Sequence, residues 1–113
     1  MGTILRALEQ KMIGSPEELV VDIVRNEMAR IMELAPRSRW YLFGSITSNK
    51  RPVSDIDLLV VCESSEDCAK VRGGLAAVCA KFPIHLLLMT QVEEAEVNFI
   101  EGVRALEIGC ATC

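Results

Sequence analysis

The sequence has few aromatic residues and no excess of basic charge. Aromatic side chains make up 4% of the 113 residues, too few for the stacking platform of a protein that binds single-stranded nucleic acid. Lys and Arg number 12 against 16 for Asp and Glu, so the formal net charge is −4. Proteins that bind duplex DNA usually carry a basic footprint, and we therefore expect no duplex nucleic-acid partner. Binding of a small anionic ligand remains an alternative, because a locally positive pocket can bind an anion despite the net negative charge.

Long apolar runs are also missing. No segment reaches the ~18 uncharged apolar residues that a membrane span needs. Arg6, Glu9 and Lys11 interrupt the N-terminal segment, which therefore lacks the apolar core of a signal peptide. We expect no membrane association and a cytoplasmic, reducing location.

The cysteines do not form a disulfide framework. They are odd in number and mostly have apolar neighbours, as buried thiols do: Cys62, Cys68, Cys79, Cys110 and Cys113. The last two form a C-x-x-C, but no strand-to-helix context for a redox motif and no further zinc ligands accompany it. We interpret that ending as a frayed tail.

What is present is ordinary globular composition, with 50% hydrophobic and 25% charged residues. The length suits one core, and we expect one domain over residues 1–113. Apolar spacing predicts a short helix over residues 3–13. Ser15, Pro16 and Glu18 are typical of a helix start, and this second helix is expected to run to about Ala35. Its predicted inward residues are Leu19, Ile23, Val24, Met28, Ile31 and Leu34.

Three strands are expected, over residues 40–43, 55–62 and 83–89. Ser64 or Ser65 caps a helix lasting to about Lys81, and Thr90 with Glu93 forms a capping box that opens a last helix. Residues 103–108 fit either a helix or a short edge strand. The predicted fold class is α/β of the α+β type, a small mixed sheet of three or four strands with helices mainly on one face.

The stretch from Gly44 to Asp57 carries the chemistry. Gly44-Ser45 ends a strand, and Asp55-Ile56-Asp57 follows after nine residues. Alternate strand residues share a face, so the two carboxylates would lie about 6 to 7 Å apart and repel unless a cation bridges them. Mg²⁺ prefers such oxygens and keeps positions open for phosphate. Gly44 lets backbone approach a ligand closely, and Lys50 and Arg51 in the loop are placed to meet phosphate charge.

This stretch resembles the signature of the DNA polymerase β-like nucleotidyltransferase superfamily, in which a strand ending in Gly-Ser or Gly-Gly precedes Asp-hydrophobic-Asp-hydrophobic. With one compact domain, the chain is similar to the minimal nucleotidyltransferase subgroup over about residues 16–101. The resemblance implies transfer of a nucleoside monophosphate, with AMP from ATP favoured, to a hydroxyl acceptor. Gly44 and Ser45 would hold the triphosphate, and Asp55 and Asp57 would coordinate two Mg²⁺ ions. Minimal members often pair with a helical HEPN-type protein in toxin–antitoxin systems.

Two positions depart from the family pattern. His85 stands where active members carry a third carboxylate on the next strand. Imidazole is a poor Mg²⁺ ligand, so His85 is expected to act as a neutral base or to orient the acceptor. In the loop, Ile46 follows Ser45 where Arg is frequent, and Asn49 stands near a glycine position.

Simpler interpretations stand beside these. Asp55 and Asp57 can be ordinary turn and strand-edge carboxylates, and a Gly-Ser turn ends many strands. His85 can be a solvent-facing side chain, and Lys50 and Arg51 can belong to a solvated loop. Three functions therefore remain open. The first is an active Mg²⁺-dependent nucleotidyltransferase, and the second a catalytically impaired module that binds nucleotide or protein. In either case a chain of this size can form a homodimer. The third is an α/β domain whose motif is accidental.

Overall fold

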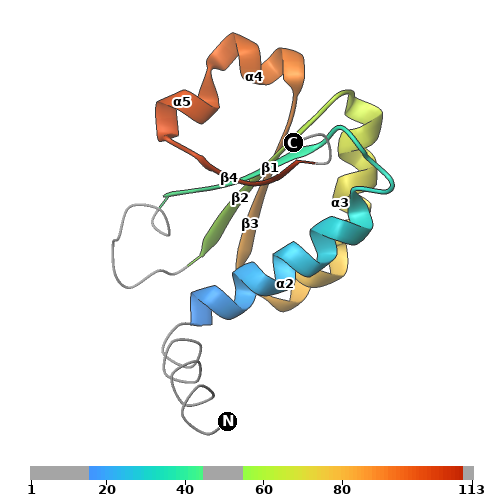
Figure 1. The fold of residues 1–113 in the computed structure, drawn as a ribbon, viewed down its shortest axis with the longest axis vertical. Coiled ribbons are helices and arrows are strands. Elements are labelled where there is room, and N and C mark those ends of the chain that lie inside the picture. The colour runs from blue at the N-terminus through green and yellow to red at the C-terminus, as the bar shows by residue number, and fades with distance from the viewer. Residues whose placement is uncertain (1–15, 45–54, 111–113) are drawn as a thin grey trace, which may run out of the picture.

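The computed structural model describes residues 16–44 and 55–110 (Figure 1). The helix predicted over residues 3–13 and the loop over residues 45–54 lie outside these ranges. The described elements follow one another as α2 (Pro16–Ile31), β1 (Arg39–Phe43), β2 (Ile56–Cys62), α3 (Ser65–Lys81), β3 (Ile84–Thr90), α4 (Gln91–Val97), α5 (Phe99–Val103) and β4 (Leu106–Cys110). None of these described helices is both long and apolar enough to cross a membrane.

The described strands form a four-stranded sheet in the order β3-β2-β1-β4. β1 is antiparallel to both of its neighbours, whereas β2 and β3 are parallel and are connected by α3. A parallel pair requires such a crossover, and a helix is the usual one. The predicted small mixed sheet of an α+β fold is therefore confirmed. The alternative left open for residues 103–108 resolves as the end of α5 followed by the edge strand β4, so Cys110, expected in a frayed tail, ends a strand.

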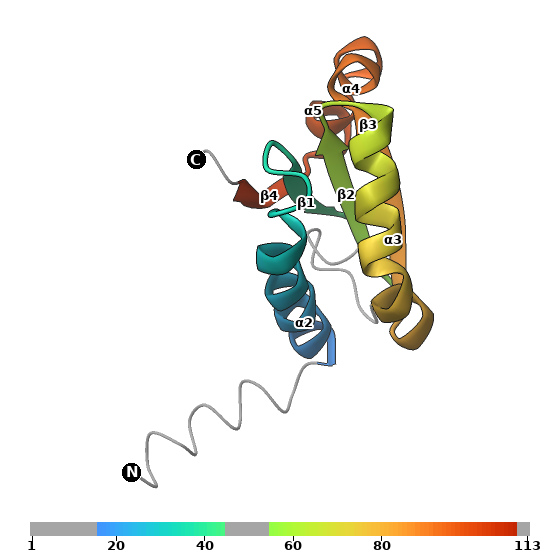
Figure 2. The ribbon, with the colours of Figure 1, turned by 90° about the vertical axis from the view of Figure 1, so that its right-hand side faces the viewer.

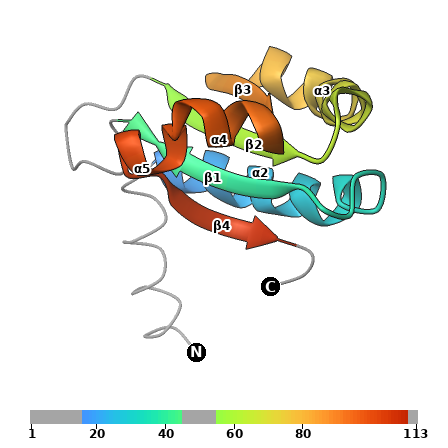
Figure 3. The ribbon, with the colours of Figure 1, turned by 90° about the horizontal axis from the view of Figure 1, so that it is seen from above.

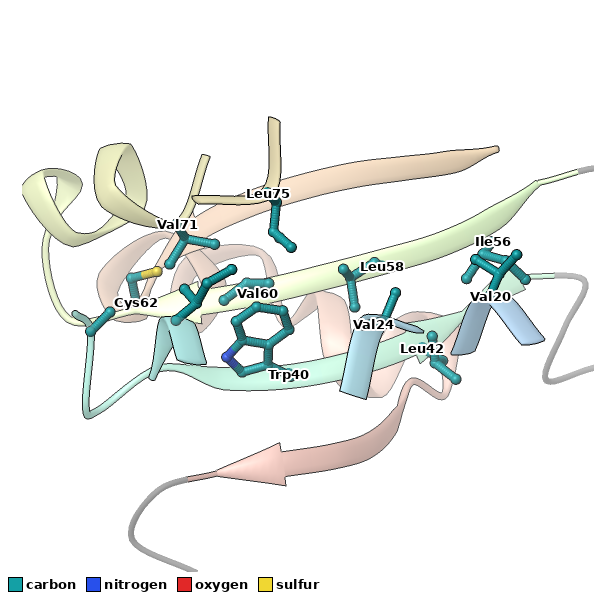
Figure 4. Close-up of a cluster of buried hydrophobic side chains, with 12 residues drawn as sticks. Val20, Val24, Trp40, Leu42, Ile56, Leu58, Val60, Cys62, Val71 and Leu75 are labelled. Atoms are coloured by element: carbon teal, nitrogen blue, oxygen red, sulfur yellow. The ribbon is translucent and has the colours of Figure 1, made fainter. Parts of the chain in front are cut away.

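The larger core lies between the sheet and the helices α2 and α3 (Figure 2). It contains Val20, Val24, Ile31, Ala35, Trp40, Leu42, Ile56, Leu58, Val60, Cys62, Val71 and Leu75 (Figure 4). Strand alternation sends Asp57, Leu59 and Val61 of β2 to the opposite face. Trp40 is fully buried, and its indole N–H donates to Ser38 Oγ at 2.9 Å, so the core satisfies its polar atom.

α2 is shorter than predicted and buries part of the predicted set: Val24 and Ile31 are buried, and Met28 packs against the core. It ends at Ile31, and tightened turns lead from there to Pro36. Leu19 is 57% exposed and Leu34 is 47% exposed, so the prediction that both face inward was wrong. Leu19 lies about 100° around the helix from Val20, the residue that does contact the core, and Leu34 follows the helix.

The other face of the sheet is covered in part by α4 and α5 (Figures 1 and 3). A smaller cluster there buries Tyr41, Leu59 and Val61, with Phe43, Phe99 and Ile100 among the side chains packed against it. The predicted caps are confirmed. Ser64 accepts from the amide of Asp67 at the start of α3, and Thr90 and Glu93 form the reciprocal box at the start of α4. α4 follows the end of β3, whereas Phe99 of α5 reaches Phe43 at the end of the face where β2 and β3 begin, beside the candidate site.

Candidate functional site

Three predicted site residues meet where one strand ends and two begin. Gly44 follows β1, Asp57 is the second residue of β2, and His85 is the second residue of β3. Asp57 is paired in register with Phe43 on one side and with His85 on the other. The sheet therefore brings together residues that are separated by a loop and by a complete helix.

The absence of a side chain at Gly44 leaves room for the Asp57 carboxylate. Its φ is +79°, a conformation that side-chain-bearing residues rarely adopt. A methyl group built on Gly44 would overlap Oδ2 of Asp57. The carboxylate thus lies directly against the backbone at the bend, and the sequence uses glycine there for two separate physical reasons.

Asp57 and His85 form a polar pair. Nδ1 of His85 lies 3.2 Å from Oδ1 of Asp57, so a protonated Nδ1 donates to the carboxylate. The Asp57 side chain is 23% exposed and that of His85 is 74% exposed. Phe43, next to the pair, contacts Phe99 of α5 edge-to-face, with ring centroids 5.1 Å apart. The pair therefore has an apolar wall on one side and is open to solvent at the imidazole.

The other predicted residues are placed less completely. Asp55 was expected inside the strand, but β2 begins at Ile56, and Asp55 is an exposed residue directly before it. The Ile56 amide donates to the Pro83 carbonyl at 2.8 Å and ties the start of β2 to the residue before β3. Ser45, Lys50 and Arg51 lie outside the described residues, and their roles in holding phosphate stay predictions.

The donor set decides which cation the site fits. Within residues 16–44 and 55–110, no group of three or more His, Cys, Asp or Glu side chains is arranged to hold a metal ion. A closed structural site is therefore not formed there. An open site fits better, with one or two carboxylates on the ion and phosphate oxygens completing the shell. The two-Mg²⁺ arrangement fits poorly, since the residue paired with Asp57 on β3 is His85, which offers an imidazole and no carboxylate oxygen.

The sequence analysis missed a hollow of about 390 Å³ on the same face of the sheet, at the opposite end. It is lined by Arg37, Arg39, Tyr41, Val61, Gln91, Glu94 and Ile100, and by none of the predicted site residues. Arg39 and Phe43 are about 13 Å apart along β1. The hollow beside Arg39 is therefore separate from the place where Gly44, Asp57 and His85 meet. Burial raises the pKa of Tyr41, and a hydrogen bond from Arg39 acts in the opposite direction. The alternation Arg39-x-Tyr41 was the available signal, but the hollow also needs residues of α4 and α5, which the tertiary structure brings to it.

Comparison with known proteins gives a fold and no family. No protein-family model matches the sequence, and no curated protein matches it significantly. A solved crystal structure described as a "putative nucleotidyltransferase" is similar in fold, with a TM-score of 0.55 and 20% sequence identity. The similarity covers 75% of this chain and 97% of that one. The fold is therefore similar to that of this solved structure, and in the present chain Gly44, Asp57 and His85 meet at one end of the sheet.

Proposed function

We propose that this chain is a nucleotidyltransferase. It binds a nucleoside triphosphate together with a divalent cation at the Gly44–Asp57 corner and transfers the nucleoside monophosphate to a hydroxyl acceptor. The observation that supports this most is the contact of the Asp57 carboxylate with the bend at Gly44, beside an open imidazole. Such a corner places a cation ligand next to backbone that a phosphate chain can approach. ATP is the first nucleotide to test, as the resemblance implies.

In the proposed reaction the protein forms no covalent bond to the substrate and acts by positioning the reacting groups. The acceptor oxygen forms a bond to the α-phosphorus, the bond from that phosphorus to the bridging oxygen breaks, and pyrophosphate leaves with the electron pair. The hydroxyl proton is released to water. A bound cation neutralises phosphate charge as it moves toward the leaving group. Asp57, and Asp55 before it, hold that cation, while the Gly44 bend, with Ser45, Lys50 and Arg51, positions the triphosphate.

Thermal unfolding tests the nucleotide site. ATP and a divalent cation (Mg²⁺ and Mn²⁺ in separate series) should together raise Tm more than the sum of their separate effects, because both bind only the folded site. Asp57→Asn and Asp55→Asn should each abolish the joint shift. Glu96→Gln, an equally charge-neutralising change on exposed α4, should retain it. A joint shift that survives Asp57→Asn places the nucleotide elsewhere and contradicts the proposal.

Transfer is tested separately with ATP labelled at the α-phosphate. Incorporation of label into an acceptor protein, lost in Asp57→Asn, is the expected result. A helical HEPN-type protein is the first acceptor to try, because the resemblance brings in that partner. Label that enters only when the γ-phosphate carries it would identify a kinase and overturn the assignment.

A binding module is the second candidate. The observation in its favour is His85, which lies 3.2 Å from Asp57 where the resemblance expects a third carboxylate. A joint ATP–cation shift without transfer to any acceptor would favour this function. His85→Asp restores the expected acid, and gain of transfer in that variant would identify a site that has lost turnover. Size-exclusion chromatography with light scattering would show whether the module is a homodimer.

A further inference from the structure

The geometry points to a mixed oxygen–nitrogen chelate: Asp57 and His85 together bind a first-row transition-metal dication, of the class of Mn²⁺, Co²⁺ or Zn²⁺, in preference to Mg²⁺. This inference concerns the same site as the proposed function and rests on it only for the role of the bound ion. It replaces the two-Mg²⁺ arrangement implied by the sequence motif with a single ion of different chemistry.

The spacing of the two donors suits one ion. Ligand atoms about 2.1 Å from a metal, at angles between octahedral and tetrahedral, are about 3.0 to 3.4 Å apart. Asp57 Oδ1 and His85 Nδ1 are 3.2 Å apart. Both atoms can therefore contact one ion without a large change in either side chain. The ion takes the place of the shared proton.

The backbone fixes this spacing. Asp57 and His85 are direct partners in the parallel register of β2 and β3. The Ile56–Pro83 hydrogen bond anchors the same end of the two strands. On the other side, the Gly44 backbone lies against Oδ2 of Asp57. Both donors are thus mounted on rigid elements, as a specific metal site requires.

The donor chemistry sets the preference. Mg²⁺ takes oxygen ligands almost exclusively, so the imidazole of His85 beside Asp57 contributes little to binding it. Imidazole suits Zn²⁺ and its first-row neighbours such as Co²⁺, and the affinity of a given nitrogen–oxygen site rises from Mn²⁺ to Co²⁺ along the first-row series. Since the described residues offer no group of three donors, the ion keeps open positions for water or phosphate oxygens. An open shell is what a site that also receives a triphosphate needs.

Proton NMR offers a direct test because His85 is the only histidine in the chain. No other imidazole contributes signals to the spectrum, so metal bound by thiols elsewhere in the chain is not mistaken for metal bound at His85. Addition of Co²⁺ to the full chain should displace and broaden both imidazole CH signals, and Zn²⁺ should shift them without broadening. The same concentration of Mg²⁺ should leave them unchanged. Imidazole signals that respond equally to Mg²⁺ and Co²⁺, or to neither, overturn the inference.

Two variants separate a chelate from a lone surface histidine. Asp57→Asn removes a direct ligand and should weaken the Co²⁺ response of His85 by at least about tenfold, because loss of an outer-shell partner alone costs about 10- to 100-fold in metal affinity. Glu96→Gln should leave it unchanged. His85→Asp, at a 74% exposed side chain, should fold normally and shift the Co²⁺-to-Mg²⁺ affinity ratio toward Mg²⁺ by about tenfold, measured by calorimetry. An unchanged ratio, or an Asp57→Asn variant that binds Co²⁺ as tightly as the parent, contradicts the chelate.

The outcomes also separate this inference from the proposed function. ATP binding and transfer with an imidazole that no metal perturbs would overturn the chelate and leave the transferase standing. A Co²⁺ response that depends on Asp57, in a protein that binds no nucleotide, would support the chelate and overturn the transferase.

Discussion

Gly44 and Asp57 show how a single residue controls the candidate site. The left-handed conformation of Gly44 turns the chain out of β1, and the missing side chain leaves room for the Asp57 carboxylate. Any larger residue would meet both the backbone strain and the steric overlap at once. The overlap falls on Oδ2 of Asp57, the side chain that the proposed function depends on most.

Gly44→Ala is therefore expected to remove the joint ATP–cation shift in Tm while the protein still folds. The left-handed backbone should cost about 1–2 kcal/mol of unfolding free energy, and the displaced carboxylate should lose its cation. Gly102→Ala in α5 is the control, since a methyl group there meets nothing within 4 Å. Retention of the full shift in Gly44→Ala would show that the Gly44 contact does not organise the site.

At the scale of elements, α3 carries two adjacent glycines in different surroundings. Gly73 has open space around its Cα, whereas a methyl group on Gly74 would lie 3.0 Å from Cγ1 of the fully buried Ile31 in α2. The Gly74 carbonyl also accepts from Arg30 at 3.1 Å. Gly74 thus marks the close approach of α2 and α3, while Gly73 is free to change.

Alanine substitutions at Gly73 and Gly74 should have different effects on stability. Gly73→Ala should raise the unfolding free energy by about 0.5–1 kcal/mol, because alanine loses less backbone entropy in a helix. Gly74→Ala reduces the backbone entropy lost on folding by the same amount, but its methyl group must displace Ile31. The Gly74→Ala variant should therefore be less stable than Gly73→Ala by about 1 kcal/mol. Urea unfolding of both variants measures the difference. Equal stabilisation by the two changes would show that the helices separate without cost.

The cap of α4 is a second feature at this scale. No residue of α4 is buried, so packing contributes little and the reciprocal Thr90–Glu93 hydrogen bonds hold its first turn. Thr90→Ala should cost about 1 kcal/mol locally and should speed amide hydrogen exchange within Gln91–Val97, with little effect on β2. Thr90→Ser keeps the hydroxyl and should restore slow exchange. Uniformly faster exchange across the sheet would mean that the cap supports the whole fold.

For the molecule as a whole, buried thiols link stability to pH. Cys62 is fully buried, and burial, followed by its contact with Cys68, raises its pKa from 9.0 to about 12. Burial also raises the pKa of Cys79. The folded chain therefore keeps protons that the unfolded chain releases above about pH 9, and the free energy of unfolding must fall as pH rises through that region.

Tm should consequently decrease from about pH 8 to about pH 10, and Cys62→Ala should flatten the decrease although its Tm is lower throughout. Val71→Ala truncates a neighbouring core residue without a titrating group (Figure 4), and it should lower Tm while keeping the original pH dependence. Scanning calorimetry in the presence of reductant measures all three proteins. Parallel curves for the parent and Cys62→Ala would contradict the role of this thiol.

The sequence by itself determined the features that depend on a few neighbouring residues. Ser64 and Thr90 cap helices because their hydroxyl groups reach amides three positions away, and the alternation in residues 56–62 follows from strand geometry. These predictions succeeded because the forces involved act within one or two turns of chain.

Only the tertiary structure decided what depends on distant partners. Leu19 and Leu34 have the apolar character of core residues, yet the sheet and α3 contact α2 along Val20, Val24 and Ile31 instead. The edge strand β4, the hollow beside Arg39 and the 3.2 Å spacing of Asp57 and His85 likewise arise from register and packing. Burial of apolar surface is not directional, so local sequence names the candidates for contact, and the packing of complete elements selects among them.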